Sequence, residues 1–352
     1  MAFVQNVHST STSRRSNGQS FDGVTHQYNI SDFQGYAGHF DKATVAQLQN
    51  HKDIDHIEPD QIWSLEALIT QSQSEYGLSL ISQKTMGRPG YFYDSSAGAG
   101  TWSYVVDSGI NIEHREFQGR GNLGYNAVDK NARAWGDRVG HGTHIAGIMG
   151  SKTYGVAKKT QLIAVKVVDG RDGVFSQILD GYQWAVKDIT SKGRTLKAVI
   201  HVSTYGPYTQ AWERAVKAAF ESKVTTVYPA GNENRDPTPR LGELSHYAII
   251  VGATNARRYR AQFTNYGPAV TIFAPGVEIK STWGHDGTRA VSGTAQAAAH
   301  VSGLISYFKG LETVLMPSAR AVRGYIIAKS LPEAVAVPGG PKARFAYNGS
   351  GR

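Results

Sequence analysis

The sequence predicts an α/β fold, in which a mostly parallel sheet is flanked by helices and preceded by a small α+β domain. Three observations support this fold class. Short apolar runs alternate with helical patterns beyond residue 72, as in sheets whose parallel strands are joined by helices. The 40% of apolar residues and the 39 glycines suit a globular protein with many turns. A length of 352 residues can hold one large core domain and a small second one.

The chain divides into three parts. Residues 1–23 are polar and rich in Ser, Thr and Asn, which predicts a flexible N-terminal arm. Residues 24–71 are predicted to form the small domain and residues 72–352 the large one. We place the boundary there because residues 64–74 lose the periodicity seen on either side of them.

Apolar patterns predict the elements of both domains. In the small domain a strand begins near Val24, a helix covers 44–50 and a second strand ends at Ile57. In the large domain, continuous apolar runs predict buried strands at 104–106, 162–168, 198–202, 224–227 and 248–251. Helical patterns between and after these runs predict helices at 176–191, 209–221 and 295–308.

Charge and composition exclude several classes of protein. The net charge is +9, but Lys and Arg are scattered rather than gathered in a stripe with aromatic residues, so we expect no nucleic-acid partner. No run approaches the ~18 apolar residues that a membrane span needs. The chain has no cysteine, which excludes disulfides and thiolate metal sites.

Three segments carry candidate catalytic positions. Asp107 lies in Tyr-Val-Val-Asp-Ser-Gly-Ile, His141 in Gly-His-Gly-Thr-His-Ile-Ala-Gly, and Ala295 in Val-Ser-Gly-Thr-Ala-Gln-Ala-Ala-Ala-His-Val-Ser-Gly-Leu. Asp107 follows a predicted strand, whereas His141 and Ala295 open predicted helices. Because sites in open α/β sheets lie at the carboxyl ends of the strands, we expect the three positions to converge.

These segments resemble subtilisin-like serine proteases of the proteinase K type, whose triad follows the chain order Asp, His, Ser. The resemblance covers nearly the whole chain and implies a subtilisin-like fold. Residues 24–63 look like the inhibitory prodomain of fungal alkaline proteases, so the expected partner is this chain's own prodomain in cis. Other segments similar to those proteases are at 153–159, 228–234 and 263–267.

The resemblance implies a role for each site residue. Asp107 would hold the imidazole of His141 in one tautomer and stabilise its charged form, and His141 would be the general base. Asn232 would donate its side-chain amide to a developing oxyanion. Ala295 stands where the family has its attacking Ser, and a methyl group cannot act as a nucleophile.

The resemblance also indicates a substrate-binding strand, at Ser203, Thr204, Tyr205 and Gly206. In the family this strand commonly ends Ser-Leu-Gly-Gly and pairs with the substrate backbone. Tyr205 places a phenol where a glycine would leave room, which predicts a narrowed specificity pocket.

No metal ligands and no cofactor are predicted. Asn255 stands where some relatives have a calcium-binding Asp, and calcium sites depend on carboxylate and carbonyl oxygens. Calcium binding is therefore an alternative that the sequence disfavours but does not exclude.

Three functions follow. The first is a non-proteolytic pseudoprotease that has been recruited as an acid–base catalyst, an isomerase or a cyclase. Its substrate would be a small carbonyl-bearing molecule, and its catalytic residues would be His141, Asp107 and Asn232. The second is a purely binding or regulatory pseudoprotease. The third is a serine endopeptidase precursor inactivated by an engineered Ser-to-Ala change at residue 295. Further departures from the family pattern near the cleft favour natural loss over engineering, at Tyr205, Pro229, Gln296 and Ala299.

The N-terminal sequence bears on the compartment. Met-Ala-Phe-Val-Gln-Asn-Val-His lacks the basic start and apolar stretch of a signal peptide. We expect a cytoplasmic protein if Met1 is the native start, and a secreted protein if a signal peptide has been removed.

Overall fold

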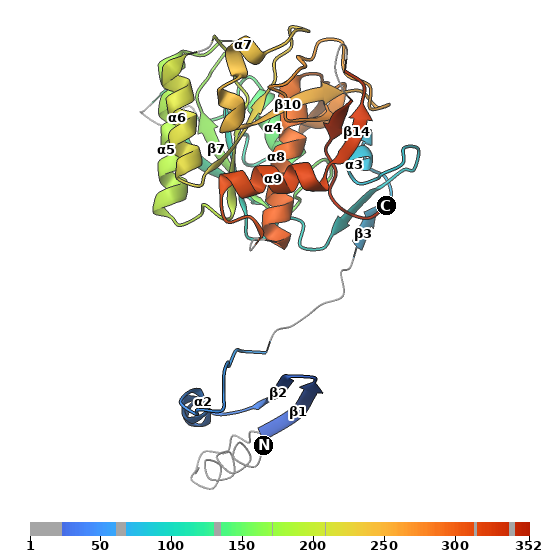
Figure 1. The fold of residues 1–352 in the computed structure, drawn as a ribbon. Helices are drawn as coiled ribbons and strands as arrows, with labels where there is room; N and C mark the ends of the chain where they lie inside the picture. The colour runs from blue at the N-terminus through green and yellow to red at the C-terminus, as the bar shows by residue number, and fades with distance from the viewer. Residues whose placement is uncertain are drawn as a thin grey trace. The chain divides into compact units, whose positions relative to one another are not determined.

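The structure, a computed structural model, describes residues 23–60, 68–129, 135–170, 172–207, 209–312, 315–337 and 342–352. The chain forms two compact units, Met1–Leu65 and Glu66–Arg352 (Figure 1). The predicted arm at residues 1–23 lies outside the described residues, except for Gly23.

The described part of the small unit is a hairpin followed by a helix. Strands β1 (Gly23–Ile30) and β2 (Phe33–His39) pair antiparallel, so a strand is present where we predicted one. The predicted helix is α2 (Lys42–Gln49), whose N-terminus is capped by Asp41: the Thr44 N–H donates to Asp41 Oδ1 at 2.7 Å.

Our prediction of a strand that ends at Ile57 is wrong. Residues 50–60 contain no strand, and the Ile54 N–H donates to His51 O in a turn. Ile54 and Ile57 are both half-buried and lie three residues apart, whereas a half-buried strand alternates with a period of two.

The boundary between the units also differs from our division after residue 71. Strand β3 (Leu68–Gln71) pairs antiparallel with β4 (Tyr91–Asp94), which belongs to the large unit. Backbone hydrogen bonds to β4 therefore hold residues that we had assigned to the small domain. Sequence periodicity is weak here because the strand has only four residues.

A nine-stranded sheet forms the centre of the large unit within the described residues, in the order β14-β15-β11-β10-β9-β8-β5-β7-β6. Its neighbouring strands run parallel except for β14 against β15, which confirms the predicted mostly parallel sheet. The strands are β5 (Trp102–Asp107), β6 (Gly121–Asn126), β7 (Gln161–Lys166), β8 (Ala198–Val202), β9 (Thr225–Pro229), β10 (Ile249–Thr254), β11 (Ile272–Pro275), β14 (Leu331–Val335) and β15 (Ala343–Phe345).

Helices cover both faces of this sheet, as predicted. Helices α4 (His141–Gly150) and α8 (Thr294–Leu311) share one apolar cluster, and α5 (Phe175–Ser191) and α6 (Gln210–Glu221) share another. Strand β5 separates the clusters, because Val105 belongs to the first and Tyr104 and Val106 to the second. This alternation is what a strand buried on both faces requires.

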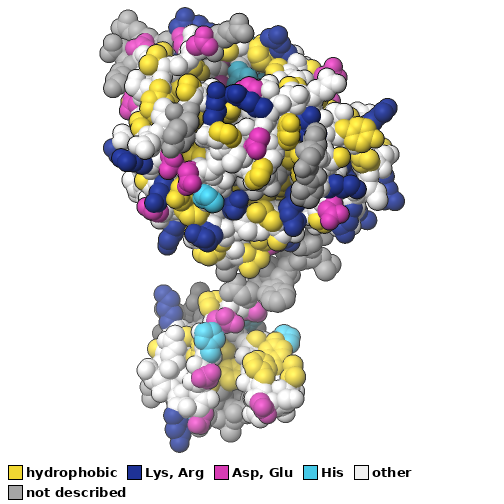
Figure 2. Space-filling model, turned by 45° about the horizontal axis from the view of Figure 1, so that its top comes forward, with side chains coloured by type: hydrophobic (Ala, Val, Ile, Leu, Met, Phe, Trp, Pro, Cys, Tyr) yellow, Lys and Arg dark blue, Asp and Glu magenta, His cyan; other side chains and the backbone are white. Residues whose placement is uncertain are grey.

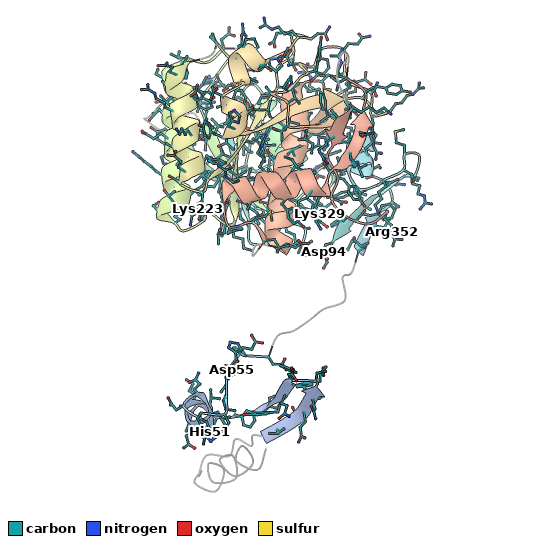
Figure 3. All side chains as sticks on the ribbon, viewed as in Figure 1. His51, Asp55, Asp94, Lys223, Lys329 and Arg352 are labelled. Carbon is teal, nitrogen blue, oxygen red and sulfur yellow. The ribbon has the colours of Figure 1, made fainter. Side chains whose placement is uncertain are left out.

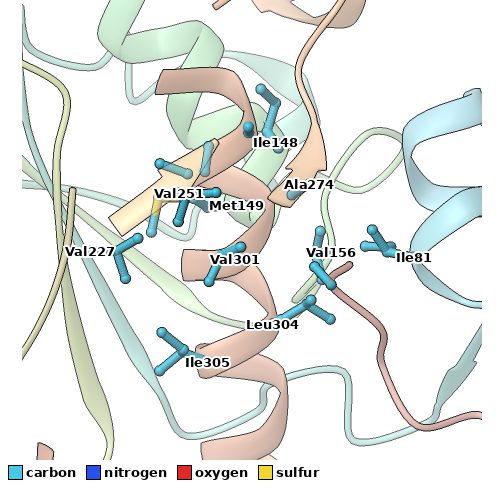
Figure 4. Close-up of a cluster of buried hydrophobic side chains, with 14 of the residues drawn as sticks. Ile81, Ile148, Met149, Val156, Val227, Val251, Ala274, Val301, Leu304 and Ile305 are labelled. Carbon is cyan, nitrogen blue, oxygen red and sulfur yellow. The ribbon is translucent and has the colours of Figure 1, made fainter. Parts of the chain in front are cut away.

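Helix α8 forms the centre of the first cluster. Its Val301, Leu304 and Ile305 are at most 1% exposed and lie among strand side chains that include Val227 and Val251 (Figure 4). Fully burying one such side chain stabilises the fold by roughly 1.5–3 kcal/mol. The helix is thereby anchored along its length, and its first turn is placed at the carboxyl edge of the sheet.

The remaining elements surround this core. They are α3 (Tyr76–Ile81), η1 (Arg115–Phe117), α7 (Thr238–Leu241), η2 (Leu244–His246), the antiparallel pair β12 (Ile279–Trp283) and β13 (Gly287–Val291), and α9 (Ala319–Lys329).

The C-terminal segment packs beside β4. Figure 3 labels Arg352 and also Asp94, the last residue of β4. The Asn348 side-chain amide donates to Phe92 O at 2.6 Å, and the Lys84 N–H donates to Arg352 O at 2.5 Å. These bonds attach the end of the chain to β4 and to the loop after α3.

The surface is mixed in charge. On the face shown in Figure 2, Lys and Arg side chains are spread among acidic, apolar and neutral polar ones. Within the part of the chain that the structure describes, no helix combines the length and the apolar character needed to cross a bilayer.

The start of α4 is held by the buried carboxylate of Asp137, which is 5% exposed. Asp137 Oδ1 accepts from the Gly140 N–H at 2.7 Å and from the Ser108 hydroxyl at 2.8 Å. Asp137 Oδ2 accepts from both the N–H and the hydroxyl of Thr143, at 2.8 and 2.7 Å. An acidic group at a helix N-terminus satisfies free N–H groups and complements the helix dipole.

We expect Asp137→Ala to lower the free energy of unfolding by about 2–4 kcal/mol, since it leaves several buried donors without an acceptor. Urea denaturation measures the loss. The matched control is Asp172→Ala, because Asp172 is exposed and should change stability by less than about 0.5 kcal/mol. Equal effects of the two substitutions would contradict this account of α4.

Candidate functional site

The centre of the site is the pair formed by His141 and Asp107. Asp107 is the last residue of β5, and His141 is the first residue of α4. His141 Nδ1 lies 2.8 Å from Asp107 Oδ2 and 3.0 Å from Asp107 Oδ1. The carboxylate is 3% exposed and the imidazole 30% exposed, so the ring keeps one side open to solvent.

Glycines allow the close approach on which this pair depends. Gly140 precedes α4 with a φ of 86°, a conformation that glycine adopts without strain. A Cβ on Gly142 would collide with Gly109 O, in the turn after β5. The helix start is therefore close to the strand end that carries Asp107.

The pair shifts the pKa values of both partners. Burial raises the pKa of Asp107, but the charge and hydrogen bond of His141 lower it more, with help from Ser203 and the Ser108 N–H, and the result is about 2. Burial lowers the pKa of His141, while Asp107 and then Asp137 raise it, and the net shift is upward. The site thus favours a charged carboxylate beside a ring whose pKa is raised above that of an ordinary histidine.

The second ring nitrogen of His141 faces Gln296, which is 1% exposed in the first turn of α8. Gln296 Nε2 lies 3.3 Å from His141 Nε2. An amide nitrogen donates and does not accept, so this contact needs a lone pair on the ring nitrogen. It suits a ring whose proton sits on Nδ1, toward Asp107.

Asn232 and Ala295 meet at the N-terminus of α8. Asn232 Oδ1 accepts from the Thr294 N–H at 3.0 Å and from the Thr294 hydroxyl at 2.9 Å. This orientation leaves the exposed Asn232 amide nitrogen free to donate toward a ligand. Ala295 follows Thr294, is 8% exposed, and carries an N–H in the first helical turn, where intrahelical acceptors are lacking.

The predicted substrate-binding residues follow β8, whose Val202 pairs with Val106 next to Asp107. The Ser203 hydroxyl lies close enough to lower the pKa of Asp107 but makes no well-aligned hydrogen bond. Thr204 is half-buried and Gly206 is exposed.

Tyr205 is the residue of this segment that fills space. An ideal Cβ on Gly231 would lie 2.7 Å from Tyr205 Cζ, and the Tyr205 ring centroid is 6.5 Å from that of Tyr228. The Tyr205 hydroxyl is buried and has no hydrogen-bond partner among the described residues. The phenol therefore occupies the space beside the turn that carries Asn232.

The residues near Asn255 do not fit a calcium site. Asn255 Oδ1 accepts from the Arg257 N–H at 2.9 Å and from the Tyr259 N–H at 3.1 Å, so its oxygen closes a turn. Within the described ranges, no three His, Cys, Asp or Glu side chains gather as metal ligands.

The structure brings Asp107, His141, Asn232 and Ala295 to one edge of the sheet, and adds two residues whose contacts we did not predict. Asp137 could have been suspected as an acidic residue just before a predicted helix. Gln296 was noted only as a departure from the family pattern. Its contact with His141 depends on how α4 and α8 pack, which no local pattern encodes.

The pKa shifts predict a pH-dependent effect of Asp107→Asn. Asp107 has a lowered pKa, so its contribution to stability is present above its ordinary value of 3.8 and is lost as the pH falls toward about 2. His141 has a raised pKa, so its contribution is present below its ordinary value of 6.5 and is lost as the pH rises through the folded value.

Both contributions overlap between about pH 4 and pH 6.5. We expect Asp107→Asn to destabilise the protein most in that window, by about 1–2 kcal/mol more than at pH 3 or pH 9. Urea denaturation at three pH values measures the difference. A penalty that stays constant with pH would show that the pair contributes hydrogen bonds but no charge.

Comparisons with known proteins agree with this geometry. The model of the subtilase family matches residues 99–347, and that of peptidase inhibitor I9 matches residues 2–66. Alkaline protease 1 of Aspergillus clavatus is 46% identical, over 99% of this chain and 86% of that protein. The alkaline proteinase of Hapsidospora chrysogena is 42% identical, over 100% of this chain and 88% of its own length.

A solved structure gives the same result. The crystal structure of a cold-adapted subtilisin-like serine proteinase is similar with a TM-score of 0.72 and 31% identity, over 79% of this chain and 99% of that one. The family match covers well over half of the chain, and the inhibitor match ends at residue 66, five residues before the end of the small domain that we predicted. The chain therefore belongs to the subtilase family and carries an N-terminal segment of the peptidase inhibitor I9 type.

Proposed function

We propose that this chain is a non-proteolytic subtilase, a pseudoprotease that keeps the base and the oxyanion donor of the family without its nucleophile. One observation carries the proposal: the residue between Thr294 and Gln296, at the start of α8 beside His141 and Asn232, is alanine. Acyl transfer by this constellation needs an oxygen or sulfur atom there. In subtilisin, loss of the catalytic serine lowers turnover by about 2 × 10⁶-fold.

The unmodified chain should neither cleave peptides nor cut itself near residues 64–74, because both reactions need the same missing nucleophile. A fluorogenic peptide series should give only background rates, and intact mass spectrometry of fresh protein should show one uncut chain. A homogeneous product starting near Ser72 or Ser74 would overturn the proposal.

The control for this experiment is Ala295→Ser. A precursor changed only at residue 295 would regain cleavage at the rates of active family members and would release its N-terminal segment. That outcome would favour an engineered knockout over natural loss. We expect little recovery, because Tyr205 fills space beside Gly231 and a misplacement of about 1 Å can cost a hundredfold in rate.

A second candidate function is acid–base catalysis on a compact carbonyl-bearing molecule. Two observations favour it: the imidazole of His141 is 30% exposed, and the Asn232 amide nitrogen is free to donate. A positioned base typically contributes 10²–10⁴-fold, and an oxyanion donor stabilises an enolate-like oxygen. Together they suit an isomerisation or a cyclisation without a covalent intermediate.

For such a reaction, His141→Ala should lower turnover by about 10²–10⁴-fold and Ala295→Gly by less than about threefold. Candidate substrates are screened with the unmodified chain, and each active one is repeated with both variants. Unchanged turnover in the His141 variant would remove the acid–base function and leave a binding or regulatory pseudoprotease.

A further inference from the structure

The two nitrogens of His141 have unequal roles. Nδ1 is held by the Asp107 carboxylate, so any proton exchanged with a ligand or a nucleophile must pass through Nε2. In this structure that nitrogen is already in contact with the Gln296 amide at 3.3 Å. The nitrogen through which the base would act is therefore already occupied by a side chain of the same molecule.

Gln296 is buried at the start of α8. Its side chain is 1% exposed, and its backbone carbonyl lies 3.0 Å from the ring Nδ1 of His300, one turn further along α8. An ideal Cβ on Gly293 would lie 2.6 Å from Gln296 Oε1 and 3.7 Å from Asn232 Nδ2. The Gln296 amide therefore lies between His141 and Gly293, and the Asn232 amide nitrogen lies on the same side of Gly293.

Charge and hydrogen bonding act on His141 in opposite directions. Burial disfavours the charged ring, whereas Asp107 on β5 and Asp137 before α4 favour it. His144 on α4 and His201 on β8 have pKa values lowered to about 4 and about 3, mainly by burial and partly by His141, so both are neutral where His141 titrates. An amide donor on Nε2 also disfavours the charged ring, because an imidazolium has a proton at that nitrogen and cannot accept.

We propose that Gln296 is a positioning residue that binds His141 Nε2 in place of a nucleophile hydroxyl, selects the ring tautomer protonated on Nδ1, and withholds the base from any hydroxyl at residue 295. The loss of proteolysis then involves two adjacent residues, Ala295 and Gln296. This inference deepens the proposed function and rests on it, but the protonation of the His141 ring can be measured directly in the unmodified chain.

The first test is NMR of the imidazole nitrogens in the unmodified protein, Gln296→Met and Gln296→Glu. The unmodified ring should be the Nδ1-protonated tautomer at high pH, and its pKa should be roughly 0.5–1 unit below that in Gln296→Met. Gln296→Glu, which adds a charge, should raise the pKa above both. Gln296→Leu repeats the comparison if the methionine variant does not fold.

The matched control is Gln183→Met, because Gln183 is exposed on α5 and should leave the His141 titration unchanged. Equal pKa values in the unmodified protein and Gln296→Met, or a ring protonated on Nε2, would overturn the inference. Peptide cleavage by the unmodified chain would instead remove the proposed function and leave this NMR result standing.

The second test asks whether Gln296 blocks an introduced hydroxyl. Ala295→Ser alone and combined with Gln296→Met are treated with a small organophosphorus fluoride. The hydroxyl oxygen bonds to phosphorus, fluoride leaves, and His141 takes the hydroxyl proton, so the reaction needs the base but no peptide pocket. Labelling followed by mass spectrometry should be at least about tenfold faster in the double variant. Equal rates would overturn the inference.

Discussion

The arrangement of the site depends on two helices that pack on the same face of the sheet and begin at the same edge of it. Helices α4 and α8 share one apolar cluster, in which Ala297, Ala298 and Ala299 are fully buried. Such small side chains let the helix axes and the strands beneath them come close. Gly303 of α8 shows how close the two helices are: a Cβ there would lie 3.1 Å from Met149 O of α4. Because both helices start at this edge, their first turns meet, and His141 contacts Gln296.

The electrostatics of the site follow from that packing. Two buried carboxylates, Asp107 and Asp137, lie at the beginning of α4, where a helix dipole favours negative charge. Asp137 accepts from N–H groups at the start of the helix, and Asp107 accepts from the imidazole of His141. His141 therefore has an anionic partner, the Asp107 carboxylate, on its Nδ1 side. On the other side its Nε2 lies 3.3 Å from the neutral amide of Gln296.

Much of this could be predicted from the sequence. Long periodic segments such as 176–191 and the apolar runs of the sheet specify their own elements, because burial on one or both faces imposes a repeat. The order of the motifs around Asp107, His141 and Ala295 was sufficient to place them at one sheet edge. The strand near Ile57 failed, since two isoleucines three residues apart fit a turn as well as a strand. Strand β3 escaped prediction because four residues carry too little pattern.

The sequence does not predict which side chains of different helices contact each other. Gln296 differs from the family pattern by one residue type, and that difference alone does not say whether the amide points to solvent or to the base. The answer comes from α8 being buried on all sides at its first turn, where a polar side chain must find a partner. His141 Nε2 is such a partner, and an amide donor satisfies it without adding charge.

The Asp107–His141 pair also contributes to the stability of this chain, which has alanine at residue 295. Asp107 is 2% exposed, and removal of His141 would leave a buried carboxylate without its compensating ring, which is strongly destabilising. The pair therefore has a structural role that is independent of any chemistry. Asn232 has a similar one, because its oxygen caps α8 through Thr294. Retention of these residues is not in itself a sign of catalysis. His141 Nε2 is in contact with the buried Gln296 amide, so only the exposed Asn232 side chain presents an amide that a structural role does not require.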